Sequence, residues 1–167
     1  MDSLFLSHEV WHAFDSTARY SIESFYMDFE TGSADDFGAS LTGIGVNLLV
    51  RDVRRSAEFL SHVFGMTAHR VSDDFAIMQY QGQVMQLHAD HTFRTHPMLG
   101  LVPELPPRGA GAQFYLFQSD PDAAVDRAKQ IGADILELPT DKPHGLRETC
   151  ILCPDGYVWS PACALHN

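Results

Sequence analysis

The same order of predicted elements occurs twice in this chain, and this duplication constrains the fold more than any other feature of the sequence. The first unit combines an apolar run of strand length, a helical pattern and three short strand patterns, at 43–50 (GIGVNLLV), 51–65, 67–72, 75–80 and 84–89. The second unit repeats this order at 112–118 (AQFYLFQ), 119–132, 133–139, 147–153 and 157–164. Two units of βαβββ order indicate an internal duplication. We therefore predict an α+β fold of two tandem βαβββ modules, at about 43–89 and 112–163.

The ends of both helices carry recognisable signals. Asp52 precedes the first helical pattern as a candidate N-cap, and Gly65 follows it as a candidate stop. In the second unit Asp120 is the candidate N-cap, Pro121 occupies the first helical position, and Gly132 marks the end.

Residues 1–40 differ in composition from the rest and are predicted to form a separate N-terminal extension, with the duplicated domain at 41–167. They carry eight carboxylates and one arginine, a net charge of −7 out of −11 for the 167 residues. An apolar stripe predicts one amphipathic helix or two short ones, with members Val10, Phe14, Ala18, Ile22, Phe25 and Phe29. The following ETGSADDFGAS, residues 30–40, is interpreted as a linker or long loop. We expect the arm to pack on the body or on a partner subunit, with a regulatory or membrane-surface helix as the alternative.

Composition limits the class of protein. Hydrophobic residues make up 45% of the chain and charged residues 20%, which is globular composition, and no apolar run approaches the length of a membrane span. The acidic balance disfavours nucleic acid and anionic membranes as partners. MDSLFLSHEV lacks the pattern of a secretory signal, so we expect a cytoplasmic protein with Cys150, Cys153 and Cys163 reduced.

The stretch MQLHADHTFRTHP, residues 85–97, raises the question of a metal ion. His88, His91 and His96 are donors that zinc, iron and nickel accept, with Asp90 between them. Residues 90–111 have no periodicity and hold four of the nine prolines, so they are predicted to form a long connection of the kind that is often functional. His91 and His96 fall within this connection, where a histidine is most often solvated.

Three stretches resemble a known family, the vicinal oxygen chelate superfamily of glyoxalases, bleomycin resistance proteins and dioxygenases. They are GVNLLVRDVRRSAEFLSHVFGM, FQSDPDAAVDRAKQIGADI and PHGLRETCILCPDGYVW. In addition, SDDFAIMQYQGQVMQLHA is similar to the bleomycin-binding branch, and Cys153 stands where the family usually has an aspartate before Pro154. The resemblance covers residues 43–163 and implies that the two modules curl into an eight-stranded cleft.

The resemblance also implies four metal-ligand positions, one on the first and one on the last strand of each module. In this sequence they fall on Gly45, Gln86, Gln113 and Ser160. Glycine offers no donor and serine a poor one, so we expect the inherited metal site to be absent, and no cofactor.

Alternation along the strands gives an expected set of cleft-facing residues: Gly45, Asn47, Leu49, Gln86, His88, Gln113, Tyr115, Phe117, Val158 and Ser160. Phe75 and Tyr80 are expected to flank this set, Trp159 to face the helix layer as core, and Cys150 to be a buried inert thiol. His88 lies two residues after Gln86 and is expected on the same face of the strand. Three interpretations of His88 stay open: a metal site with fewer ligands, formed with Gln86 and Gln113; contact with a ligand without metal; or no special role.

Amides, one imidazole and aromatic rings suit the binding of a planar or amphipathic small molecule. We predict a homodimeric, metal-independent binding protein of the resistance or sequestering type, with ligand contacts from Asn47, Gln86, His88, Gln113, Tyr115, Phe117 and Ser160. One alternative is a metal-dependent lyase, isomerase or dioxygenase that uses His88, and another is an interaction module whose acidic arm binds a protein partner.

Overall fold

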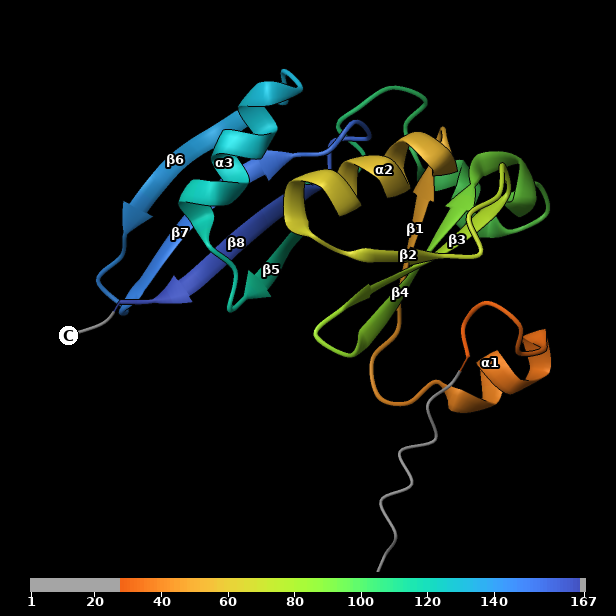
Figure 1. Cartoon of the computed structure of the whole chain (residues 1–167). Helices are drawn as coiled ribbons and strands as arrows, with labels where there is room; N and C mark the ends of the chain where they lie inside the picture. The colour runs from red at the N-terminus through yellow and green to blue at the C-terminus, as the bar shows by residue number, and fades with distance from the viewer. Residues whose placement is uncertain (1–27, 166–167) are drawn as a thin grey trace, which may run out of the picture.

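The computed structural model describes residues 28–165 and shows two modules side by side (Figure 1). Module one contains β1 (Val46–Val50), α2 (Val53–Phe64), β2 (Thr67–His69), β3 (Phe75–Tyr80) and β4 (Gln83–Ala89). Its sheet has the order β1-β4-β3-β2, in which β1 pairs with β4 in parallel and the other neighbours are antiparallel. The predicted βαβββ order of the first unit is therefore confirmed.

Module two repeats this arrangement with β5 (Gln113–Phe117), α3 (Pro121–Gln130), β6 (Ile135–Asp141), β7 (Leu146–Leu152) and β8 (Val158–Ala164). Its sheet has the order β5-β8-β7-β6, and again only the first and last strands pair in parallel. The α+β class and the tandem modules are confirmed. The eight strands form two open four-stranded sheets, and they do not close into one barrel.

Helices α2 and α3 cover one face of their sheets and begin and end where the sequence predicts. The Asp52 side chain accepts a hydrogen bond from the backbone N–H of Arg55 at 3.0 Å, and Gly65 ends α2 in the left-handed conformation with φ 70°. The Asp120 side chain likewise accepts from the N–H groups of Asp122 and Ala123.

Trp159 joins the cores of the two modules. Its side chain is 1% exposed, and its ring lies 5.8 Å from that of Phe64 in α2 and 4.9 Å from that of Phe114 in β5. The prediction that Trp159 faces the helix layer as core is confirmed.

The long connection 90–111 contains two short 3-10 helices, Asp90–Phe93 and Pro97–Leu101, and a buried ion cluster anchors its end. The Arg108 guanidinium, 2% exposed, donates to both carboxylate oxygens of Asp90 at 2.6 and 2.7 Å, and lies 3.8 Å from Asp155. Asp155 is equally buried and accepts from the side chains of Arg51 and Ser56 at 3.0 and 3.1 Å. This cluster links module one, the connection and the β7–β8 turn.

The stretch 30–40 is not a loop throughout, because residues Ala34–Ser40 form helix α1. Ser33 and Asp36 make a reciprocal capping box, and Phe37 is buried, which together offset the low helix propensity of this stretch. Helix α1 lies on the side of sheet one opposite α2 (Figure 1). The predicted apolar stripe from Val10 to Phe25 lies outside the described residues.

Within residues 28–165, no helix is both long enough and apolar enough to span a membrane.

Candidate functional site

The predicted site residues of module one lie on the face of the sheet that α2 leaves free. Asn47 pairs with Gln86 and Leu49 with His88 across β1 and β4, so all four side chains share that face. The Nε2 atom of His88 lies 3.3 Å from the Oε1 atom of Gln86, and the imidazole packs between the rings of Phe75 at 4.8 Å and Phe93 at 5.2 Å. Burial lowers the pKa of His88, so the neutral imidazole is favoured.

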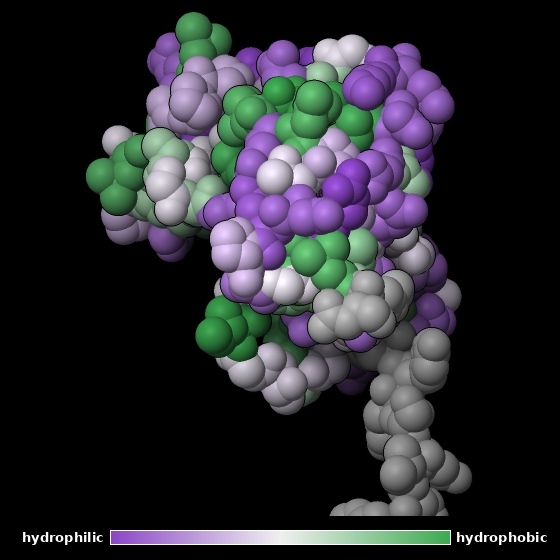
Figure 2. All heavy atoms as spheres, turned by 90° about the vertical axis from the view of Figure 1, so that its left-hand side faces the viewer, coloured by the Kyte–Doolittle hydropathy of each residue, from purple (hydrophilic) through white to green (hydrophobic). Residues whose placement is uncertain are grey.

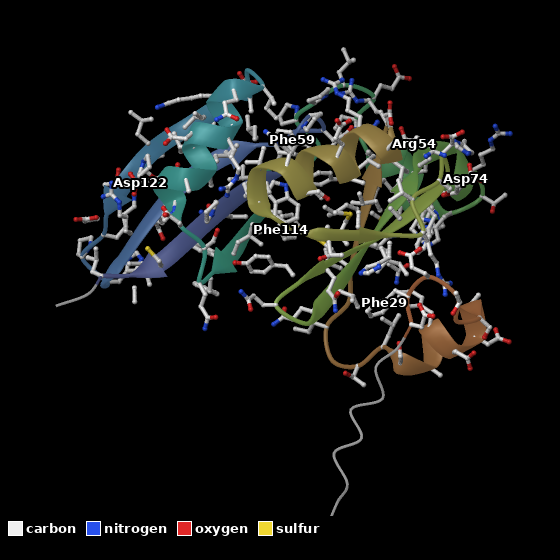
Figure 3. The ribbon with its side chains drawn as sticks, in the orientation of Figure 1. Phe29, Arg54, Phe59, Asp74, Phe114 and Asp122 are labelled. Carbon is white, nitrogen blue, oxygen red and sulfur yellow. The ribbon has the colours of Figure 1, made fainter. Side chains whose placement is uncertain are left out.

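The N-terminal arm, residues 28–40, covers this face. Phe37 of α1 packs edge-on against Phe75 with 6.5 Å between ring centroids, and Phe29 packs on His69 at 5.1 Å. Figure 3 shows Phe29 where the arm meets the sheet. Leu49 is 0% exposed, while the buried Oδ1 atom of Asn47 has no hydrogen-bond partner. The arm therefore covers the part of this face around Phe75 and His69, while Asn47, Gln86 and His88 remain partly exposed.

The predicted residues of module two lie on a sheet face where, among residues 28–165, Tyr115 and Phe117 are exposed and Ser160 is buried. Gln113 donates from Nε2 to the Ser160 hydroxyl at 2.7 Å, and the Cys150 sulfur lies 3.4 Å from that oxygen. The rings of Tyr115 and Phe117 stack 5.5 Å apart with planes 10° from parallel, and they are 40% and 56% exposed. These two rings form an accessible aromatic surface.

One expectation about an individual side chain is wrong. Cys150 is only half-buried, and the buried thiol is Cys153, whose pKa is raised by desolvation. Phe75 and Tyr80 each contact a member of the predicted set: the Phe75 ring packs on His88, and the Tyr80 hydroxyl donates to the Phe117 carbonyl at 2.7 Å.

The two loop histidines have structural contacts of their own. The Nε2 atom of His91 lies 2.6 Å from a carboxylate oxygen of Asp74. The Nδ1 atom of His96 accepts from the N–H of Met98 at 3.1 Å and caps the second 3-10 helix. His96 also packs on Phe93 at 5.0 Å, the same ring that contacts His88, whereas His91 pairs with Asp74.

A groove of about 1010 Å³ lies between the two modules and was not predicted from the sequence. Its walls are the chain before β1, the β3–β4 hairpin and β5, with Phe29, Gln79, Tyr80, Gln113, Tyr115 and Trp159 among its lining residues. Of the predicted cleft residues it brings together Gly45, Gln113 and Tyr115. Among the described residues, none of the twenty that line it carries a carboxylate, an amine, a guanidinium, an imidazole or a thiol.

The groove depends on the tertiary placement of one hairpin. Gln81 and Gly82 both have positive φ, 49° and 76°, which gives the tight turn that brings β3 and β4 together. Residues 81–83, QGQ, form this turn, and the Tyr80 hydroxyl joins the hairpin to β5 by donating to the Phe117 carbonyl.

A model of the Glyoxalase/Bleomycin resistance protein/Dioxygenase superfamily matches residues 44–160. The chain belongs to this superfamily. No curated protein matches the chain.

Several solved structures share the fold. A glyoxalase/bleomycin resistance protein/dioxygenase family enzyme from Burkholderia phytofirmans PsJN is 17% identical with a TM-score of 0.61, over 72% of this chain and 97% of that chain. A glyoxalase/bleomycin resistance protein/dioxygenase from Nocardioides is 22% identical with a TM-score of 0.57, over 79% and 92%. TioX from Micromonospora sp. ML1 is 23% identical with a TM-score of 0.55, over 75% and 100%. At these identities the likeness establishes the fold alone.

The metal-ligand positions of the superfamily do not fit a divalent ion in this chain. Gly45 has no donor atom, and the Ser160 hydroxyl is hydrogen-bonded to Gln113. Gln86 lies on β4 of module one, where its Oε1 atom is 3.3 Å from the Nε2 atom of His88. Within the described part of the chain, no group of three or more His, Cys, Asp or Glu side chains is arranged to hold a metal ion.

Proposed function

We propose that this protein binds a small, neutral, planar molecule in the groove between its modules, without a metal ion. The observation that carries the proposal is the chemistry of the lining, which combines aromatic rings and amides with no strongly charged group among the described residues. Ligand sites in proteins are largely apolar clefts of about 300–1000 Å³ with a few polar groups that fix orientation.

The same lining argues for binding and against catalysis. General acid–base chemistry requires a titratable side chain within hydrogen-bond reach of the reacting group. Among the described residues that line this groove, Tyr80 and Tyr115 carry phenolic hydroxyls, and the Tyr80 hydroxyl already donates its proton to a carbonyl. Amides such as Gln79 and Gln113 orient a ligand without exchanging protons with it.

The net charge of the chain does not determine the charge of this ligand. Many of the carboxylates lie in residues 1–40, and the acidic side chains of the described residues do not line the groove. An uncharged ligand therefore suits the groove better than the cationic one that the acidity alone would favour.

The family context supports a sequestering role of the bleomycin-resistance type. The matching family includes bleomycin resistance proteins in its description, and the neighbour from Nocardioides carries the same description. We place this role in the cytoplasm, since Cys150, Cys153 and Cys163 are free thiols. We also propose that the protein acts as a homodimer.

Titration of the full-length chain with Nile red tests the proposal, because this neutral planar dye fluoresces strongly in apolar surroundings. We expect saturable binding to the wild-type protein, and about tenfold weaker binding to Tyr115→Ala, which removes an aromatic wall of the groove. Phe93→Ala is the matched control, because Phe93 lies in the 90–111 connection and does not line the groove. Equal weakening by both variants, or no binding to the wild-type protein, would contradict the proposed site.

A further inference from the structure

Two consecutive residues at the end of β2 hold the arm on module one. The Arg70 guanidinium donates from Nε to the Phe29 carbonyl and from Nη2 to the Gly32 carbonyl. The adjacent His69 places Nδ1 at 2.9 Å from a carboxylate oxygen of Glu30. The attachment of the arm thus depends on a few polar contacts at one point of the sheet.

The apolar contacts of the arm are equally few. Phe37 is 7% exposed and packs against Phe75, and Phe29 packs on Phe37 and on His69. The face that the arm covers keeps the unpaired Oδ1 atom of Asn47, so the cover does not satisfy the polar groups there. A segment held by two aromatic anchors and one arginine has the local stability of an element that opens before the core unfolds.

The arm is joined to β1 by an exposed segment suited to act as a hinge. All five residues from Leu41 to Gly45 are exposed, Gly43 has φ 73°, and no neighbouring atom lies within 4 Å of the Cβ position of Gly43 or Gly45. These five residues also line the groove, as does Phe29 of the arm. Movement of the arm about this hinge therefore moves one wall of the groove.

We propose that residues 28–40 form a displaceable cover whose release from His69 and Arg70 controls how fast a ligand enters and leaves the groove. The inference rests on the proposed function, because it concerns access to the same groove. In the clamped state the arm fixes Phe29 and the Leu41–Gly45 segment against the ligand. When the clamp opens, that wall swings away and exposes the bound molecule to solvent.

Stopped-flow fluorescence with Nile red and hydrogen exchange by mass spectrometry, both on the full-length chain, test the inference. Arg70→Ala removes both carbonyl contacts, and we expect amide exchange in residues 28–40 to become about tenfold faster. Association and dissociation of Nile red should both accelerate by about the same factor, so that the equilibrium affinity changes by less than about threefold. Glu30→Ala, at an exposed position that does not threaten folding, should act in the same direction with a smaller effect.

Arg147→Ala is the matched control, because Arg147 also makes charged contacts, with Asp122 and Asp141, but on module two. It should leave both the exchange of the arm and the rates of Nile red unchanged. If Arg70→Ala and Glu30→Ala release the arm while the dye rates stay at wild-type values, the arm does not control access. If the wild-type protein binds no dye at all, the proposed function itself fails, and the inference fails with it.

Discussion

At the scale of single residues, stability depends on the ion cluster where the modules meet. Arg108 and Asp155 are each 2% exposed and lie 3.8 Å apart, and each has a second charged partner, Asp90 for Arg108 and Arg51 for Asp155. Tyr157 lies beside them and donates its hydroxyl proton to the Leu49 carbonyl, and burial raises the pKa of Tyr157 to about 12. Truncating one member of such a cluster leaves uncompensated buried charge on the others.

We therefore expect Arg108→Ala to lower the free energy of unfolding by about 3–5 kcal/mol, as measured by urea denaturation. Arg54→Ala is the matched control, because Arg54 and Asp73 form an ion pair with side chains 60% and 83% exposed. That change should cost less than about 1 kcal/mol. Similar losses from the two variants would show that the cluster does not hold the modules together.

The partly buried imidazole of His88 should make the free energy of unfolding depend on pH. Burial lowers the pKa of His88 in the folded chain below its value of about 6.5 in the unfolded chain. The unfolded state then binds more protons between the two values, so stability is highest above pH 6.5 and falls as the pH drops through the folded pKa. Replacing the imidazole by an amide in His88→Gln should flatten this part of the profile of urea midpoint against pH. An NMR titration that placed the pKa of His88 at or above 6.5 would refute the assignment.

Strand alternation predicted the faces of several side chains but not their surroundings. It predicted that His88 and Gln86 share one face, and in the structure the Nε2 atom of His88 lies 3.3 Å from the Oε1 atom of Gln86. It could not show that Phe37 of the arm would cover that face, since this contact joins segments almost forty residues apart in sequence. Cys150, expected to be buried, is half-buried beside Ser160 and Gln113.

At the scale of elements, Asp52 fixes the start of α2. Its carboxylate accepts from the N–H of Arg55, which has no partner within the helix. We expect Asp52→Ala to reduce the free energy of unfolding by about 1 kcal/mol, whereas Asp52→Asn should change it by less than about 0.5 kcal/mol because asparagine also caps. Urea denaturation measures both, and an equal loss in the two variants would exclude capping as the cause.

The helices and strands of both modules were predictable because local signals determine them. Asp52 and Asp120 cap helices, and the β-branched and aromatic runs alternate as strands do. Helix α1 was missed because Gly38 and the polar residues around it favour a loop. Its buried anchor, Phe37, becomes decisive only when sheet one is in place.

At the scale of the whole molecule, the relation between the modules could not be derived from the sequence. A duplication predicts two similar units, but contacts such as Tyr80 to Phe117 and Tyr157 to Leu49 join residues far apart in the chain. With the modules joined in this way, the groove lies between them and is lined by residues of both. The ligand site therefore follows from how the units are joined.

Exposed apolar side chains bear on the proposed homodimer. The end of the molecule bordered by β6 exposes hydrophobic residues among hydrophilic ones (Figure 2), and Leu136 and Leu138 of β6 are 58% and 60% exposed. Tyr115 and Phe117 are also accessible. Exposed apolar surface of this kind often marks an interface.

We expect the wild-type protein to sediment as a dimer in analytical ultracentrifugation, and Phe117→Ser to raise its dissociation constant by about tenfold or more. Asp126→Ser, on the polar side of α3, should leave the dimer intact. A wild-type protein that stays monomeric at every concentration would rule out the dimer.

The central claim is that the groove binds its ligand without a metal ion. Nile red affinity should be measured on full-length protein stripped with a chelator, and again after exposure to manganese, iron, cobalt, nickel and zinc followed by gel filtration and elemental analysis. We expect equal affinities and no stoichiometric metal retained, because Gly45, Gln86, Gln113 and Ser160 do not provide a suitable donor set. A stoichiometric metal that is required for binding would contradict it and favour a metalloenzyme that uses His88.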